Sequence, residues 1–184
     1  MSQVTIADFR NCEGVAVEGD YLFESLHGAL TFAFRYSGQQ YSPSVLAQMM
    51  KGPSRSGKGL SGLDGAAQAG LIRGLIGKLP KNELSMITAK FSAEEWERIE
   101  AMKVLVVPAI CSLGTGCHSS RVAQALVQRY FGADVHLGDL SAKYYINLPT
   151  LTRNWHSVRN NLKLIWERAE ELAYLELQTG GLIP

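Results

Sequence analysis

The chain has 184 residues, of which 46% are hydrophobic, enough to bury the core of one domain or of two small lobes. The formal net charge of +1 argues against a histone-like or DNA-coating role, so any binding to nucleic acid has to be local. No apolar run reaches the roughly 18 residues of a membrane span, and the start lacks a secretory pattern, so we expect a cytoplasmic protein.

The first predicted element is a helix over 21–36, and we expect an all-α fold. Apolar residues recur in this segment at helical spacing, and Phe23 and Phe32 widen the apolar face. A helix that is hydrophobic almost all round is expected at the centre of the core. A second helix is predicted over 44–51.

A loop rich in Gly and Ser follows at 52–62. It is not a phosphate-binding P-loop, because Lys58 is followed by Gly59 and no strand precedes it. The loop is either a plain linker or a basic segment that contacts phosphate or a partner through three cations, Lys51, Arg55 and Lys58.

Three further helices are expected in the body. The segment 63–79 contains Gly70, Gly74 and Gly77, and such small residues let another helix approach closely, so we expect it to pack on the first helix. A short helix follows to Ala89, with Asn82 as its cap. The next helix opens at Ser92 and is expected to end before Pro108, with a strand-like stretch at 104–107. Its predicted inner side is Trp96, Ile99, Met102 and Val106.

A helix from Ser119 or Ser120 to Phe131, closed by Gly132, leads into a helix-turn-helix pattern. Leu137, Leu140 and Tyr144 give the first short helix of the pattern one buried stripe, and Ile146 fills the turn. Asn147 is a good N-cap and Pro149 suits the first turn of a helix, so the second helix should begin near Leu148. Ser141 and Tyr145 depart from the pattern, which favours Ala and Gly at these two positions.

The second helix is predicted to turn one side inward and the other toward the major groove of duplex DNA. The expected inner residues are Leu151, Trp155, Val158 and Leu162. The expected DNA-binding residues are those that hydrogen-bond base edges and phosphates, namely Thr150, Thr152, Arg153, Asn154, His156, Ser157 and Arg159, with Lys143 and Lys163 beside them. The alternative is an ordinary three-helix packing unit with a polar solvent face.

Charge is distributed in a way that favours DNA binding at this motif. Between Arg121 and Arg168 there are seven Lys or Arg against three acids, whereas the first twenty residues hold four acids and one Arg. An amphipathic segment at 161–178 could extend the recognition helix or pair with a second subunit. We therefore divide the chain into a helical body at 1–118 and a helix-turn-helix module with a long C-terminal helix at 119–184.

No cofactor and no catalytic site are expected. Four side chains are weak candidates for zinc ligands, but the paired spacing of structural zinc sites is missing: Cys12, Cys111, Cys117 and His118. Paired carboxylates and a nucleophile with an orienting base are also missing, so the chain is not expected to be an enzyme.

The stretch Arg129–Gly132 and the pattern through Leu162 resemble the region-4 helix-turn-helix of sigma factors. The segments 26–30 and 57–66 are similar to parts of phage and prophage proteins. Together they resemble Q-type late-gene antitermination factors of bacteriophages. The resemblance implies a cytoplasmic protein of an infected bacterium that binds DNA, contacts RNA polymerase and allows terminator read-through. A terminase small subunit-like packaging protein and a phage repressor are the alternatives.

Overall fold

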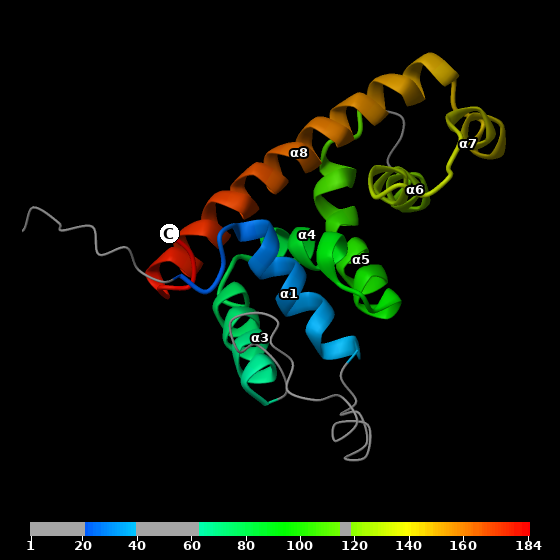
Figure 1. Cartoon of the computed structure of the whole chain (residues 1–184). Helices are drawn as coiled ribbons and strands as arrows, with labels where there is room; N and C mark the ends of the chain where they lie inside the picture. The colour runs from blue at the N-terminus through cyan, green and yellow to red at the C-terminus, as the bar shows by residue number, and fades with distance from the viewer. Residues whose placement is uncertain (1–20, 40–62, 115–118) are drawn as a thin grey trace, which may run out of the picture.

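Seven α-helices form the part of the chain that the computed structural model describes, residues 21–39, 63–114 and 119–184. No strand occurs in these ranges, so the all-α prediction is confirmed. The helices, drawn in Figure 1, are α1 (Leu26–Gln39), α3 (Leu63–Ile76), α4 (Lys81–Phe91), α5 (Glu95–Cys111), α6 (Ser120–Tyr130), α7 (Leu137–Tyr144) and α8 (Leu148–Thr179).

Two predicted features, the helix at 44–51 and the loop at 52–62, lie outside the described residues, and Lys51, Arg55 and Lys58 lie outside them too. Within the described ranges, no helix combines the length and the apolar character that crossing a bilayer requires.

Helices α1 and α3 pack side by side, as predicted, although the contact is not made through the expected glycines. α1 begins at Leu26, later than the predicted position 21. Gly70 and Gly74 face open space, so their role as close-approach points was wrong. The close approach occurs at Gly65, where a Cβ atom would overlap the ring of Tyr36.

Helix α4 begins one residue before Asn82, and Pro80 precedes it, so Asn82 is not the cap. Glu83 of α4 is buried, and its carboxylate lies 3.7 Å from the guanidinium of Arg168 on α8. Because a buried carboxylate is costly without a partner, this ion pair fixes α4 against α8.

Helix α5 differs from the prediction in length and in orientation. It continues through Pro108 to Cys111, so neither the stop at Pro108 nor the strand-like stretch at 104–107 is correct. Pro108 removes one helical hydrogen bond, but the last turn is held by packing at Ala109 and by bonds to α8 described below. The side chains of Trp96 and Ile99 remain 64% and 42% exposed, so the predicted inner side was also wrong there.

The buried face of α5 is formed by Val106, as predicted, together with Ala101, Leu105 and Ala109. Apolar residues occur on every side of this segment, so the sequence alone does not determine which of them turn inward.

Helix α8 is a single helix of 32 residues, and at 1.5 Å per residue it is about 48 Å long. Figure 1 shows it running past the whole molecule, with α6 and α7 near its N-terminal end and the body helices along the rest. The second helix predicted for the helix-turn-helix pattern and the predicted 161–178 segment are therefore one element. Its buried residues are Leu151, Asn154, Val158, Leu162, Ile165, Ala169, Ala173 and Leu177.

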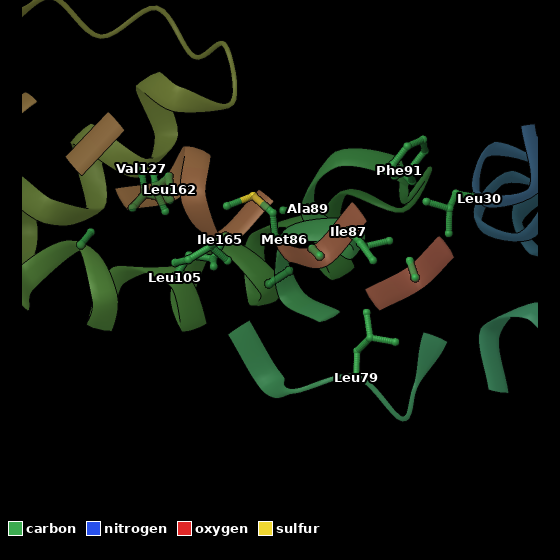
Figure 2. Close-up of a cluster of buried hydrophobic side chains, with 14 of the residues drawn as sticks. Leu30, Leu79, Met86, Ile87, Ala89, Phe91, Leu105, Val127, Leu162 and Ile165 are labelled. Carbon is green, nitrogen blue, oxygen red and sulfur yellow. The ribbon is translucent and has the colours of Figure 1, made fainter. Parts of the chain in front are cut away.

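The hydrophobic core is continuous from the body into the C-terminal module. Figure 2 shows side chains of α4, α5, α6 and α8 meeting in this cluster, including Met86, Leu105, Val127, Leu162 and Ile165. The C-terminal half of α8 thus completes the core of the body, and the two predicted parts of the chain share one hydrophobic interior.

Candidate nucleic-acid interface

Helix α7, a three-residue turn and the start of α8 lie where the helix-turn-helix pattern places them. Figure 1 views α6 and α7 nearly along their axes while α8 crosses the picture, so both are steeply inclined to α8. The turn begins at Tyr145, which has left-handed backbone angles (φ 53°, ψ 38°) and is 96% exposed. A non-glycine residue in this conformation is strained by roughly 1 kcal/mol or more.

Ser141 holds this turn. Its hydroxyl donates a hydrogen bond to the carbonyl oxygen of Ile146 at 2.7 Å, and its own carbonyl oxygen accepts one from the Ile146 N–H at 3.1 Å. An alanine at this position could make only the second bond. Ser141 therefore helps to stabilise the strained conformation that Tyr145 adopts.

Helix α8 begins at Leu148, as predicted, with Asn147 at the N-cap position and Pro149 in the first turn. The backbone carbonyl of Asn147 accepts a hydrogen bond from Leu151 at 3.0 Å, but its side chain makes no capping bond. The prediction for the start of the helix is thus correct, while the predicted side-chain cap is not observed.

Arg129 joins the three helices of the module. Its guanidinium group donates a hydrogen bond to the carbonyl oxygen of Val135, just before α7, and lies 5.3 Å from the ring centroid of Trp155 on α8. Gly132 ends α6 with φ of 91°, a conformation that favours glycine, and so turns the chain toward α7. One cation from α6 thus sets the positions of both following helices.

The inner side of α8 includes Asn154, which was predicted to face outward. We expected this residue to contact DNA, but it is only 6% exposed, so its predicted place on the outer face is wrong. Its Oδ1 atom accepts a hydrogen bond from the backbone N–H of Gly114 at 3.1 Å. Leu151, Val158 and Leu162 are buried as predicted, and Trp155 is half-buried.

A second asparagine, Asn161, fastens α8 to the end of α5. Its Nδ2 atom donates hydrogen bonds to the carbonyl oxygen of Pro108 at 3.0 Å and to the hydroxyl of Ser112 at 2.5 Å. Asn154 and Asn161 are one heptad apart, so they lie on nearly the same side of α8. Both hold α8 to the body.

The outer side of the first turns of α8 carries Arg153, His156, Ser157 and Asn160, all exposed. At 100° per residue these four side chains fall within about 100° of one another around the helix axis. Asn160 was missed by the sequence reading, although its spacing of three and four residues from Ser157 and His156 signals the same face. Each of the four can hydrogen-bond base edges.

Thr150 and Thr152 are less available than expected, because both are half-buried. The hydroxyl of Thr152 already donates a hydrogen bond to the carbonyl oxygen of Leu148 at 2.9 Å. We therefore place the two threonines at the edge of the outer face.

Arg159 and Lys163 lie at the flank of the outer face. Arg159 is six residues from Arg153, which places the two side chains about 120° apart around α8. Arg159 lies beside Tyr130. Burial raises the pKa of the Tyr130 phenol, Arg159 lowers this pKa, and Glu167 and Glu170 raise it further. The ammonium of Lys163 pairs with Glu167 at 3.3 Å.

Four exposed cations of the module make no ion pair with any described residue: Arg121, Lys143, Arg153 and Arg159. Lys143 lies 5.6 Å from the ring centroid of Tyr144 and is exposed. Arg121, at the start of α6, was not among the predicted site residues, and its exposure on the module adds it to the candidate phosphate contacts. Exposed cations without ion-pair partners are the side chains that phosphate contacts need.

Only one of the four zinc candidates lies in the part of the chain that the structure describes. Cys111 is exposed at the end of α5, whereas Cys12, Cys117 and His118 lie outside the described ranges. Elsewhere in the described ranges no three His, Cys, Asp or Glu side chains are grouped as metal ligands.

The chain matches no protein-family model, no curated protein and no solved structure.

Proposed function

We propose that the protein is a sequence-specific DNA-binding transcription regulator that reads the major groove with the start of α8. One observation carries the proposal: Arg153, His156, Ser157 and Asn160 are exposed together on one side of α8, while its other side is fastened to the body. A groove about 12 Å wide admits an α-helix, and the helix must be held rigidly to select among base pairs.

The residue types on this face suggest which bases they would contact. Arginine pairs bidentately with guanine and asparagine with adenine, so Arg153 and Asn160 are suited to direct readout. Arg121, Lys143 and Arg159 are exposed on the same module without ion pairs to described residues and would neutralise phosphates. The bases contribute specificity, and the phosphates contribute sequence-independent affinity.

Within this class we propose antitermination as the function, with bacterial RNA polymerase as the protein partner. The support is the resemblance of 129–162 to sigma region 4 and of the segments 26–30 and 57–66 to phage and prophage proteins, a combination that resembles Q-type factors. Co-purification of the polymerase followed by a terminator read-through assay tests this step. DNA binding without read-through would favour a repressor, and a defined ring in solution would favour a packaging protein.

DNA binding itself is tested with substitutions on the outer face. Arg153→Ala and Asn160→Ala should each weaken binding of the selected duplex by about 1 to 3 kcal/mol and relax preference at one position. Arg121→Ala should weaken all duplexes alike and reduce the salt dependence. The control is Lys81→Ala, which removes an exposed cation at the start of α4. Equal affinities for all four variants would contradict the proposal.

A further inference from the structure

A groove on the body beside Phe131 is lined by residues that the DNA-binding face does not use. It consists of two adjoining pockets, each of about 440 Å³, that share Ala89, Arg98, Phe131 and Gly132. One pocket continues over Lys90, Tyr130 and Trp166, and the other over Glu95, Ile99 and Met102. We call this surface the Phe131 groove.

The groove combines apolar walls with cations that lack carboxylate partners. Its floor includes Met86 and Ala89, both buried, and its rim includes Ile99 at 42% exposure, next to Trp96 at 64%. Large apolar side chains exposed side by side are unusual unless something covers them.

Two cations line the groove. Arg98 makes no ion pair with any described residue, and the ammonium of Lys90 lies 3.4 Å from the ring centroid of Trp166. Glu95 is the acid among the lining residues, so the lining carries one net positive charge.

The groove is on a different side of the molecule from the outer face of α8. Trp166 follows Arg153 by thirteen residues, which places the two about 140° apart around the helix axis. A molecule in the groove and a duplex on α8 therefore need not compete. Since the groove lies where α4 and α5 meet the end of α6, its occupant would contact both the body and the module.

We propose that the Phe131 groove binds a short acidic segment of a partner protein, in which a carboxylate lies beside a bulky apolar side chain. The carboxylate would pair with Arg98 and Lys90, and the apolar side chain would cover Ile99, Met102 and Phe131. Charge complementarity selects an acidic segment. Duplex DNA is disfavoured because a DNA surface needs many cations and few exposed apolar side chains.

The test uses the full chain and a fluorescent amphipathic peptide of about four helical turns, with Glu and Asp on one side and Leu and Phe on the other. Fluorescence anisotropy should show saturable binding, whereas peptides with Gln for the acids or Ser for the apolar residues should bind at least about tenfold more weakly. Arg98→Glu and Ile99→Ser should each weaken binding of the acidic peptide to a similar extent. Both replace exposed side chains, so the fold should persist, and circular dichroism checks that it does.

The matched control is Lys81→Glu, which makes the same change of charge at the other end of α4, about 14 Å along the helix from Lys90. It should leave peptide binding unchanged, and Arg98→Glu should leave duplex binding unchanged. No saturable binding, or equal weakening by Lys81→Glu and Arg98→Glu, would overturn the proposal. Loss of duplex binding in Arg98→Glu with an unchanged fold would also overturn it, because the groove would then be a DNA contact.

Discussion

Two neighbouring asparagines on α8 should separate stability from DNA binding. The side chain of Asn160 is exposed and forms no hydrogen bond with a described residue, whereas that of Asn161 is half-buried and donates to Pro108 and Ser112 at 3.0 and 2.5 Å. Substituting alanine at each position gains the same helix propensity, about 0.5 kcal/mol. The difference between the two variants therefore isolates the two hydrogen bonds.

Each intramolecular hydrogen bond contributes about 0.5 to 1.5 kcal/mol, so Asn161→Ala should be about 1 to 3 kcal/mol less stable than Asn160→Ala. For a chain of this length, each kcal/mol corresponds to roughly 2 to 4 °C in Tm. Far-UV circular dichroism during heating measures this difference. Duplex affinity is measured by fluorescence anisotropy with a selected duplex, at a temperature well below the Tm of both variants.

Binding should show the opposite order. Asn160→Ala should lose about 1 to 3 kcal/mol of duplex affinity, and Asn161→Ala should bind like the unaltered protein while it is folded. The reasoning is refuted if Asn161→Ala weakens binding without a change in Tm. It is also refuted if both variants have equal Tm values.

Three further predictions concern how the module and the body are held together. Arg129→Met should lower Tm, because it removes the hydrogen bond and the cation–π contact with Trp155 that position α7 and α8, and heating monitored by circular dichroism would show it. Tyr145→Gly should raise the free energy of unfolding by up to about 1 kcal/mol, since it relieves a left-handed residue whose side chain is exposed; a loss in urea titration would show that the ring has a structural role. Gly70→Ala should stabilise α3 by up to about 1 kcal/mol, whereas Gly65→Ala should destabilise it, and equal Tm values would contradict the packing of α3 on α1.

The end of α6 and the start of α8 could be predicted because local signals determine them. Pro149 suits the first turn of a helix, and Gly132 suits the end of α6, so sequence and structure agree at both positions. These signals act within a few residues of each other. They do not depend on what the rest of the chain does.

The side that a helix turns inward could be predicted less well, because distant contacts decide it. Between Leu151 and Val158, an inward-facing residue could be either Trp155 or Asn154. Both choices give the spacing of three and four residues that is typical of one helix face. The contact that distinguishes them is the bond to Gly114, which lies forty residues away along the chain. The same limit affects α5, where Trp96 was expected inside and is exposed.

Among the candidate site residues, Arg153, His156 and Ser157 lie on the predicted outer face, and Asn160 joins them. Asn154 is removed from that face because it is buried. Every polar residue between Thr150 and Arg159 was predicted to face outward, which is correct for the charged side chains. An amide can be buried when a neighbouring group bonds to it, and the Oδ1 atom of Asn154 accepts a hydrogen bond from Gly114, although its Nδ2 atom is buried without a partner among the described residues.

The central claim, that the outer face of α8 reads duplex DNA, is tested most directly by mapping the contact by NMR. Backbone amide signals of the isotope-labelled protein would be followed during titration with a duplex selected from a random pool. We predict that the signals of Arg153, His156, Ser157 and Asn160 change most, with smaller changes at Arg121 and Lys143 and none around Arg98. Changes confined to the Phe131 groove, or no selective change on α8, would contradict the claim.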